Sequence, residues 1–257
     1  MRALTYFTRV APRDRISLMK KVNTVAVVLK SINYRDSDKI YTLLSKDLGK
    51  IPAVARGVRK ISSRRAGNLD TLNLVKVGLS ESLSGMRQID EVSGLNSFRR
   101  LKSDYVLTIQ CSYVVELLHK TTEEGGNAEP AFELLVKFLK IASKFPENID
   151  LAVRFFEIHY LGLMGYGLNT ETCLKCKKDL VEKGPLLYLD TEHGGFICGD
   201  CSHHGLSFST QTVAKLRELT GNKLSKTGEK TLKDLSIITS ALIDEHFGIR
   251  IKSRELL

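Results

Sequence analysis

The sequence of 257 residues contains no tryptophan and only five prolines, which argues against an extracellular protein or a proline-rich interaction scaffold. It also lacks any apolar run near the roughly 20 residues that a membrane-spanning helix needs, so we expect a soluble protein with no membrane partner. Apolar residues make up 42% of the chain and charged residues 26%. This balance is typical of a globular chain and excludes a disordered or collagen-like one.

The usual signatures of catalysis are missing as well. The sequence has no Gly-x4-Gly-Lys-[Ser/Thr] phosphate loop, no Gly-x-Ser-x-Gly elbow and no His-Glu-x2-His metal motif. Carboxylate pairs such as Glu123 and Glu124 fall in a polar stretch, where they are more typical of a solvated loop than of a metal site. We therefore predict that the protein is not an enzyme, with a metal-dependent nuclease as the alternative to test.

Acidic residues are scarce in the first third of the chain. Residues 1–85 hold 17 Lys and Arg against 6 Asp and Glu, whereas residues 86–257 hold 22 and 23. The whole excess behind the formal net charge of +10 therefore lies at the front of the molecule. Such an asymmetry indicates a polyanionic partner, most often nucleic acid, and the alternative is a solvated basic surface without a ligand.

Residues 1–18 carry arginines among small and polar residues, without the apolar core of a secretory signal. We interpret them as a disordered extension, or as the result of a start placed too early, with translation then beginning at Met19. Residues 19–95 have the pattern of a small barrel. Apolar and β-branched runs predict strands near 22–30, 39–44, 51–55, 72–83 and 86–92. Five short strands with a basic loop after the third favour an OB fold.

The period of the apolar residues changes to that of helices in the region 96–257. Helices are predicted near 106–118, 132–141, 151–161, 210–220 and 229–247. A cysteine-bearing segment at 170–205 interrupts them. The predicted fold class is therefore α+β, with an N-terminal five-stranded OB-fold β-barrel followed by an all-helical domain that carries an inserted zinc-ribbon-like module.

Four of the five cysteines form two Cys-x2-Cys pairs with 21 residues between them. The predicted metal ligands are Cys173, Cys176, Cys198 and Cys201. Two such pairs can give four thiolates to one tetrahedral Zn²⁺, and the segment between them has the pattern of a hairpin, as in a zinc ribbon. Because four sulfurs leave no open coordination position, we expect one structural zinc per chain.

Other uses of these cysteines stay open at this point. Disulfides suit a secreted protein, and a redox site needs only one Cys-x2-Cys pair on a different frame. The nearby residues His193, His203 and His204 are reserve metal ligands. Cys111 lies on a predicted helical stripe, where we expect it to act as a small buried apolar residue.

The loop after the third predicted strand has five positive charges and no acidic residue over residues 56–65. Together with the neighbouring strands and turns it gives the predicted DNA-binding residues, which are Lys30, Arg35, Lys39, Arg56, Arg59, Lys60, Arg64 and Arg65. Tyr34 and Tyr41 are candidate platforms on which bases stack. Since no stretch resembles a recognition helix, we expect binding to the sugar–phosphate backbone without sequence specificity.

Several of these stretches together resemble the bacterial RecO DNA-repair family. The resemblance covers about residues 20–257 and is carried by Thr24 to Leu29, Tyr34 to Lys39, Gly49 to Lys60, the two cysteine pairs with Gly194 to Cys201, and Ile251 to Leu257. Two positions depart from the family pattern. Lys177 stands where glycine is frequent, and Ser37 stands where glutamate is common.

The resemblance implies an N-terminal OB fold, a helical domain, a zinc module and a recombination mediator rather than an enzyme. Such a mediator binds single- and double-stranded DNA, anneals complementary strands and contacts single-strand-binding protein. With RecR it assists the loading of RecA, and its implied location is the cytoplasm, at the nucleoid. A barrel followed by a zinc ribbon also occurs in RNA-binding or transcription-associated proteins, which is the alternative reading of the same pattern.

Overall fold

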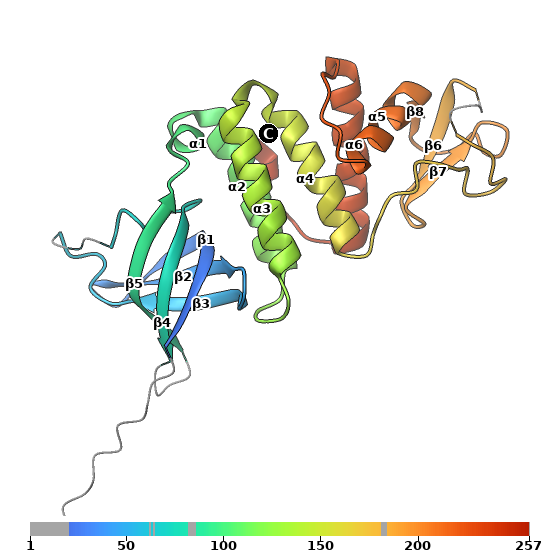
Figure 1. Ribbon diagram of the computed structural model, residues 1–257. Helices are drawn as coiled ribbons and strands as arrows, with labels where there is room; N and C mark the ends of the chain where they lie inside the picture. Colours follow the sequence, from blue (N-terminus) through green and yellow to red (C-terminus); the bar gives the residue numbers. More distant parts are fainter. Residues whose placement is uncertain (1–20, 62, 64, 82–85, 181–183, 257) are drawn as a thin grey trace, which may run out of the picture.

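The computed structural model describes residues 21–61, 63, 65–81, 86–180 and 184–256 (Figure 1). The predicted extension at residues 1–18 lies outside the described residues. Figure 1 shows a β-barrel at one end of the molecule, a group of helices in the middle and a small sheet at the far end from the barrel. No helix in the described ranges is both long enough and apolar enough to cross a membrane.

Five strands close into a barrel at the N-terminal end. They are β1 (Val22–Tyr34), β2 (Asp38–Ser45), β3 (Gly49–Ala55), β4 (Leu74–Glu81) and β5 (Arg87–Asn96). The closed order is β1-β2-β3-β5-β4. Neighbouring strands are antiparallel except for the short parallel contact between β3 and β5. This five-stranded closed barrel confirms the predicted OB-like architecture.

Alternate residues of β1 belong to two different cores. Ala26 and Val28 lie in the barrel interior, whereas Val27 and Leu29 pack outward into the core of the helical region. Successive side chains of a strand point to opposite faces, so a strand covered on both faces needs apolar residues at every position. The uninterrupted apolar run of β1 is therefore a consequence of the helices that lie against it.

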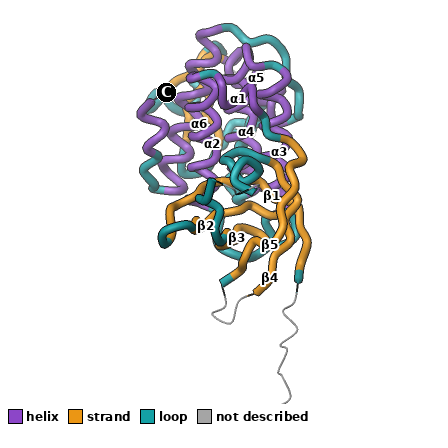
Figure 2. Tube along the Cα trace, turned by 90° about the vertical axis from the view of Figure 1, so that its left-hand side faces the viewer, coloured by secondary structure: helices purple, strands orange, loops and turns teal. Residues whose placement is uncertain are grey.

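The helical region contains α1 (Arg99–Ser103), α2 (Tyr105–Thr121), α3 (Glu129–Lys144), α4 (Ile149–Leu163), α5 (Thr210–Thr220) and α6 (Glu229–Phe247). Two 3-10 turns accompany them, η1 (Pro146–Asn148) and η2 (Lys252–Leu256). Asp104 separates α1 from α2, and its carboxylate accepts the backbone N–H of Leu107 at 3.0 Å as an N-cap. Figure 2 shows the helices gathered on one side of the barrel.

Helix α4 lies in the middle of this region and packs against α2, α3, α5 and α6. It carries a buried polar group. The Arg154 guanidinium is 3.0 Å from the carboxylate of Glu157, which also accepts the hydroxyl of Tyr113 at 2.5 Å. Burial, and next the charge of Glu157, raises the pKa of Tyr113, so its hydroxyl stays protonated as a donor.

The small sheet contains β6 (Leu186–Asp190), β7 (Gly195–Cys198) and β8 (Ser207–Ser209), in the order β7-β6-β8. The pairing of β6 with β7 is the hairpin that the sequence predicts between the two cysteine pairs. Strand β8 leads directly into α5, whose N-cap is the Ser209 hydroxyl. The sheet is thus attached to the helices at its C-terminal side through an unbroken stretch of chain.

The barrel and the helices share one apolar core. Val27, Leu29, Leu44 and Leu72 from the barrel cluster with residues of α1 to α4. At the edge of this contact, the Gly125 N–H donates to the carbonyl of Lys50 at 2.9 Å, and the ammonium group of Lys50 donates to the carbonyl of His119 at 2.7 Å. These contacts fix the barrel against α2 and against the loop that joins α2 to α3.

Candidate nucleic-acid interface and metal centre

A hollow of about 100 Å³ opens between the β1–β2 turn, the end of β3 and the start of β5. We call it the arginine hollow. It is lined by Tyr34, Arg35, Asp38, Val54, Arg56, Met86, Arg87 and Gln88. The β1–β2 and β4–β5 connections flank the face on which OB folds bind oligonucleotides. The hollow therefore lies where the fold class places a nucleic-acid strand.

Three arginines from different elements meet in the arginine hollow. Arg35 lies in the β1–β2 turn, with its guanidinium carbon 5.1 Å from the centre of the Tyr34 ring. Arg56 directly follows β3 and Arg87 begins β5. A guanidinium over an aromatic ring is held flat, with donor groups free for phosphate oxygens.

The single acid of the hollow has a structural role. The Asp38 carboxylate accepts the backbone N–H of Gly57 at 2.8 Å, which ties the β1–β2 turn to the loop after β3. Its charge offsets one of the three arginines, so the hollow keeps a positive surplus. This surplus, with the half-buried ring of Tyr34 beside it, suits a strand of phosphates and bases.

Two of the predicted DNA-binding arginines hold the loop in place. The Arg59 guanidinium donates to the carbonyls of Arg35 at 3.3 Å and Asp36 at 3.1 Å. The Arg65 guanidinium donates to the carbonyls of Ile89 at 2.9 Å and Arg56 at 2.6 Å. Both residues add positive charge near the hollow, but most of their directional hydrogen bonds go to backbone groups of this chain.

The other predicted cations lie in different places. Lys60 is exposed in the loop after β3, and Lys39 is half-buried on β2, opposite Ala55. Lys30 lies on the side of β1 that faces α2. Burial lowers the pKa of His119 on α2, and the charges of Lys50 and Lys30 lower it further. Arg64 lies outside the described residues. The structure thus brings Arg35 and Arg56 together and leaves Lys30 apart.

The prediction that Tyr41 is a stacking platform is wrong. Its ring is only 2% exposed and lies in the barrel interior beside Val28 and Ile51. Burial raises the pKa of its hydroxyl, with the charge of Asp70 as a smaller cause. Tyr34, in contrast, lines the hollow. Tyr34 is the last residue of β1, whereas Tyr41 lies within β2, where side chains alternate between the two faces and position 41 falls on the inner one.

Sequence reasoning missed Arg87 as a member of the cationic group. It lies far along the chain from the basic loop, and the local sequence around it has no excess of positive charge. One signal was present. In an OB fold the start of the fifth strand lies beside the β1–β2 turn, so a basic residue there belongs to the ligand face.

The four predicted metal ligands come together beside the small sheet, where Cys198 is the last residue of β7. The Sγ atoms of Cys173, Cys176, Cys198 and Cys201 all lie within 4.8 Å of one another. The Sγ atoms of Cys176 and Cys198 are 3.7 Å apart. Sulfurs about 2.3 Å from a tetrahedral Zn²⁺ lie about 3.8 Å from each other, so this donor set fits such an ion.

Each cysteine pair forms a tight turn. The N–H of Lys177 donates to the carbonyl of Cys173, and the N–H of Cys201 donates to the carbonyl of Cys198, each at 2.9 Å. Lys177 has a φ of 62°, a conformation that glycine adopts without strain. A glycine, which the resemblance implies at this position, would adopt this turn without strain.

Backbone N–H groups also point at the sulfurs. The N–H of Cys198 lies 3.4 Å from the Sγ of Cys173. Burial alone would raise the pKa of Cys173, but hydrogen bonds from the backbone of Cys198 and Cys176 outweigh burial and lower the pKa to about 6. At Cys173 the turn thus favours the thiolate, which is the form that binds a metal. Burial raises the pKa of Cys198, and the hydrogen bond with Cys198 raises the pKa of Cys201 to about 12, so these two sulfurs would give up their protons when a metal binds.

The alternatives for the cysteines have less support in the structure. All five thiols are free of disulfide bonds. The imidazole of His193 lies 3.1 Å from the carboxylate of Asp190, and the ring of His203 packs edge-on against Tyr188. The fifth cysteine, Cys111, is fully buried in α2, and burial raises its pKa to about 12, as expected for a small apolar core residue.

Two family profiles match nearly the whole chain. The family described as "Recombination protein O N terminal" matches residues 19–98. The family described as "Recombination protein O C terminal" matches residues 102–255. The first match covers the barrel and the second covers the helices with the cysteine module.

Curated proteins from distant bacteria give the same result. A DNA repair protein RecO of Dehalococcoides mccartyi is 32% identical over 208 residues, which cover 78% of this chain and 79% of the relative. One from Anaeromyxobacter dehalogenans is 28% identical over 248 residues, covering 93% and 96%. One from Bacillus pumilus is 27% identical over 244 residues, covering 92% and 93%. The similarity therefore extends from the barrel to the last helices.

Proposed function

Because this chain belongs to the RecO family of DNA repair and recombination proteins, we propose that it is a recombination mediator that binds single- and double-stranded DNA without sequence specificity. It anneals complementary strands and, with RecR, assists RecA loading onto DNA coated by single-strand-binding protein. The observation that carries the DNA-binding proposal is the arginine hollow, where Arg35, Arg56 and Arg87 converge beside Tyr34 on the ligand face of the barrel.

Annealing follows from the same surface. Two complementary strands repel each other through their phosphates, and a cationic face releases their counterions and lowers that repulsion. The hollow holds guanidinium groups but no recognition helix, which supports contacts to the backbone in place of base-edge reading. The proposed function needs no bond-breaking step, and a protein acting on chromosomal DNA would work in the cytoplasm, at the nucleoid.

The remaining regions receive supporting roles. We assign residues 19–95 to DNA binding, residues 96–257 to a helical domain that contacts protein partners, and residues 170–205 to a structural zinc module. Zinc is the proposed metal because an all-thiolate tetrahedral set suits it and leaves no site for a substrate. When bound, the ion would cross-link the two cysteine turns and hold the small sheet together.

The test removes the three hollow charges and spares the two arginines that hold the loop. A variant with Arg35→Gln, Arg56→Gln and Arg87→Gln is titrated with labelled single-stranded DNA by fluorescence anisotropy at several salt concentrations. Losing three phosphate contacts should reduce the slope of log affinity against log salt by about 2. Annealing of strands coated with single-strand-binding protein should slow in parallel.

A matched control removes the same charge elsewhere. Lys223→Gln, Lys230→Gln and Lys233→Gln all change exposed lysines around the start of α6, far along the chain from the barrel. An equal loss of affinity in both triple variants would show that net charge, not the hollow, drives binding. If RNA of the same sequence displaces the DNA as well as DNA itself does, the RNA-binding alternative is favoured. Cleavage of labelled DNA with Mg²⁺ or Mn²⁺ would instead reveal a nuclease.

A further inference from the structure

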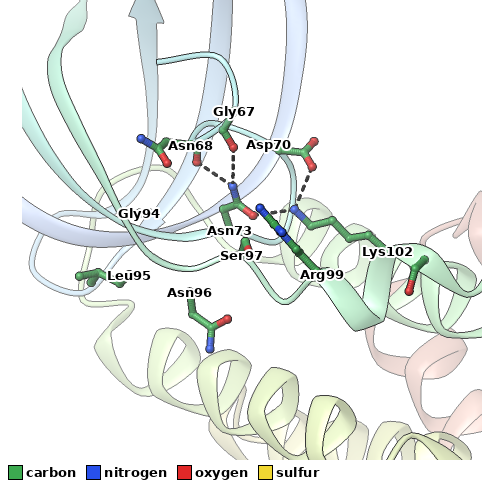
Figure 3. Close-up of a pocket in the computed structure, with 11 residues that line it drawn as sticks. Gly67, Asn68, Asp70, Asn73, Gly94, Leu95, Asn96, Ser97, Arg99 and Lys102 are labelled. Atoms are coloured by element: carbon green, nitrogen blue, oxygen red, sulfur yellow. Dashed lines mark hydrogen bonds and ion pairs between the residues drawn. The ribbon is translucent and has the colours of Figure 1, made fainter. Parts of the chain in front are cut away.

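A second and larger cavity lies where the barrel joins α1, at the other end of β5 from the arginine hollow (Figure 3). Its volume is about 710 Å³. We call it the junction cavity, and the side chains used below are Asn68, Asp70, Leu95, Asn96, Arg99 and Lys102. They come from the loop before β4, from the end of β5 and from α1. A cavity of this size falls within the range of small-molecule sites, roughly 300–1,000 Å³.

The wall on the side of the loop before β4 is rigid. Asn73 is only 3% exposed, and its amide donates to the carbonyls of Gly67 at 3.1 Å and Asn68 at 2.9 Å. A Cβ at Gly94 would come within 2.9 Å of the Asn68 side-chain oxygen, so the glycine lets Asn68 lie against β5. Asn68 is therefore held in place by the fold, although it is only half-buried.

The ion pair of the cavity is neutral but leaves a donor. The Lys102 ammonium group donates to the Asp70 carboxylate at 2.8 Å and to the Asn73 side-chain oxygen at 2.6 Å, as the dashed lines in Figure 3 show. An ammonium group has three N–H bonds, so one remains for a ligand. The second Asp70 oxygen accepts the N–H of Thr71 at 3.0 Å. Both acidic oxygens are thus already engaged.

Two further donors, on the exposed residues Asn96 and Arg99, have no protein partner in the described part of the chain. Within the residues that the structure describes, the guanidinium of Arg99 makes no hydrogen bond or ion pair. The Asn96 oxygen accepts the N–H of Phe98 at 2.9 Å, which leaves the amide N–H groups of Asn96 free. Leu95, 54% exposed, adds an apolar surface beside them. The cavity therefore offers a cation, amide donors and an apolar contact.

We propose that the junction cavity binds one nucleotide, with its phosphate at Arg99 and Lys102 and its base on Leu95, within reach of the Asn96 amide. Guanidinium groups bind phosphate through paired charge-assisted hydrogen bonds. Side-chain amides match the edges of bases, and a base offers the flat face that Leu95 can cover. The nucleotide is either free in solution or one unit of a strand that also contacts the arginine hollow, and in the second case the inference rests on the proposed function.

The test titrates the full-length protein with deoxycytidine monophosphate and follows the side-chain amide signals of Asn68 and Asn96 by NMR. Binding should shift both signals and give a dissociation constant. Arg99→Gln should weaken it by about tenfold, the loss expected for a charge-assisted phosphate contact. Asn96→Asp keeps the acceptor for Phe98 but removes the amide donor, and it should weaken binding as well.

A control on the same helix separates local charge from the cavity. Arg100→Gln changes the neighbouring exposed arginine of α1, which does not line the cavity, and should leave the dissociation constant within about twofold. Two results would overturn the proposal. The amide signals do not move with the nucleotide, or inorganic phosphate alone produces the same shifts at the same affinity.

Two more arms identify the source of the nucleotide and keep this inference separate from the proposed function. If Arg99→Gln also weakens a single-stranded oligonucleotide long enough to reach both ends of β5, the nucleotide is part of a strand. If only the mononucleotide is affected, the cavity serves free nucleotides. The triple variant of the arginine hollow should still bind deoxycytidine monophosphate, so a failure of the hollow to bind DNA leaves the cavity result standing.

Discussion

Gly49 lies where the barrel packs closely against the loop between α2 and α3. It has a φ of 71°, and a Cβ at this position would lie 2.1 Å from the carbonyl oxygen of Gly125. Only glycine fits here, because a side chain would meet both an unfavourable backbone conformation and a backbone atom that has little freedom to move. A single residue thus sets how closely the two regions can pack.

Replacing this glycine should destabilise the protein. Gly49→Ala is expected to lower the free energy of unfolding by about 2 kcal/mol or more, from the left-handed backbone and the clash together. Gly57→Ala is the control, since Gly57 has a similar φ of 64° but its nearest neighbouring atom would be 3.7 Å from the new Cβ. Urea denaturation should show a clearly smaller loss for Gly57→Ala. If both variants lost the same free energy of unfolding, the loop between α2 and α3 would have moved to accept the new Cβ at position 49, and the expected clash would be contradicted.

The two tyrosines of the barrel should respond differently to substitution. Tyr34→Ala removes the aromatic edge of the arginine hollow and should weaken single-stranded DNA binding by about tenfold, as expected for one stacked base. Tyr41→Phe keeps the ring in the barrel core and should leave affinity unchanged, since only a buried hydroxyl is lost. Anisotropy titrations at fixed salt compare the two. Unchanged affinity in Tyr34→Ala would remove Tyr34 from the proposed interface.

At the scale of the element, the two cysteine turns depend on one proposed ion. Native mass spectrometry should find one Zn²⁺ per chain, and Cys173→Ser should lose it. We expect the variant to lose protection from proteolysis at residues 170–205, because the ion would be the link that joins the two cysteine turns. The barrel should keep its DNA affinity. A metal-free wild-type protein with the same thermal stability as the purified form would contradict the assignment.

The last turn, η2, is held to α2 by one carboxylate. Glu116 accepts the backbone N–H and the hydroxyl of Ser253 at 2.9 and 2.7 Å, and it pairs with Lys120 at 2.9 Å. Burial would raise the pKa of Glu116, but the hydrogen bonds from Ser253 and the bond from Lys120 outweigh burial and lower the pKa to about 2. The ionised carboxylate is therefore the form that attaches the C-terminal turn.

This lowered pKa predicts the direction of a pH effect. The stabilisation is complete above the ordinary pKa of about 4.5 and is lost as the pH falls towards 2. At pH 7, Glu116→Gln should lower the free energy of unfolding by roughly 1–2 kcal/mol relative to the wild type. This is less than the full pKa shift would give, because water screens the partly exposed carboxylate. The difference should shrink as the pH falls from about 4.5 to 2.

A matched helical pair serves as the control for Glu116. Glu229 pairs with Lys233 at 2.9 Å with the same spacing along α6, but among the described residues it makes no hydrogen bond or ion pair with η2. Glu229→Gln should therefore show little pH-dependent change in urea denaturation. If the two variants behave alike, the attachment of η2 contributes nothing beyond an exposed ion pair.

Elements with a clear period could be predicted, and short elements could not. The residues of α5 and α6 match the predicted helices at 210–220 and 229–247, because apolar residues recur along one face of each. Helix α1 and strand β8 were missed. Each is too short for its apolar residues to show a period. Contacts with neighbouring elements stabilise them instead: α1 is bound to the loop before β4 through Lys102, and β8 pairs with β6.

At the scale of the whole molecule, the metal ligands were easier to predict than the cationic site. The fixed spacing of the two Cys-x2-Cys pairs is visible in the sequence and predicts a shared metal site. All four sulfurs lie together in the structure. The arginine hollow depends on how strands far apart in sequence close into a barrel. Arg87 enters it because β5 pairs with β3, and Lys30 lies outside it because β1 passes the helices. Local charge density alone does not contain that information.

The core shared by Val27, Leu29 and Leu44 with the helices has a practical consequence for anyone dividing the protein. In a fragment ending after Asn96, the outward-facing apolar side chains of β1 and β2 would be exposed to solvent. Copies of the fragment could then associate through this apolar surface. Such a fragment should aggregate on expression, although its sequence matches a family profile of its own. Heating the intact chain should melt barrel and helices in a single step.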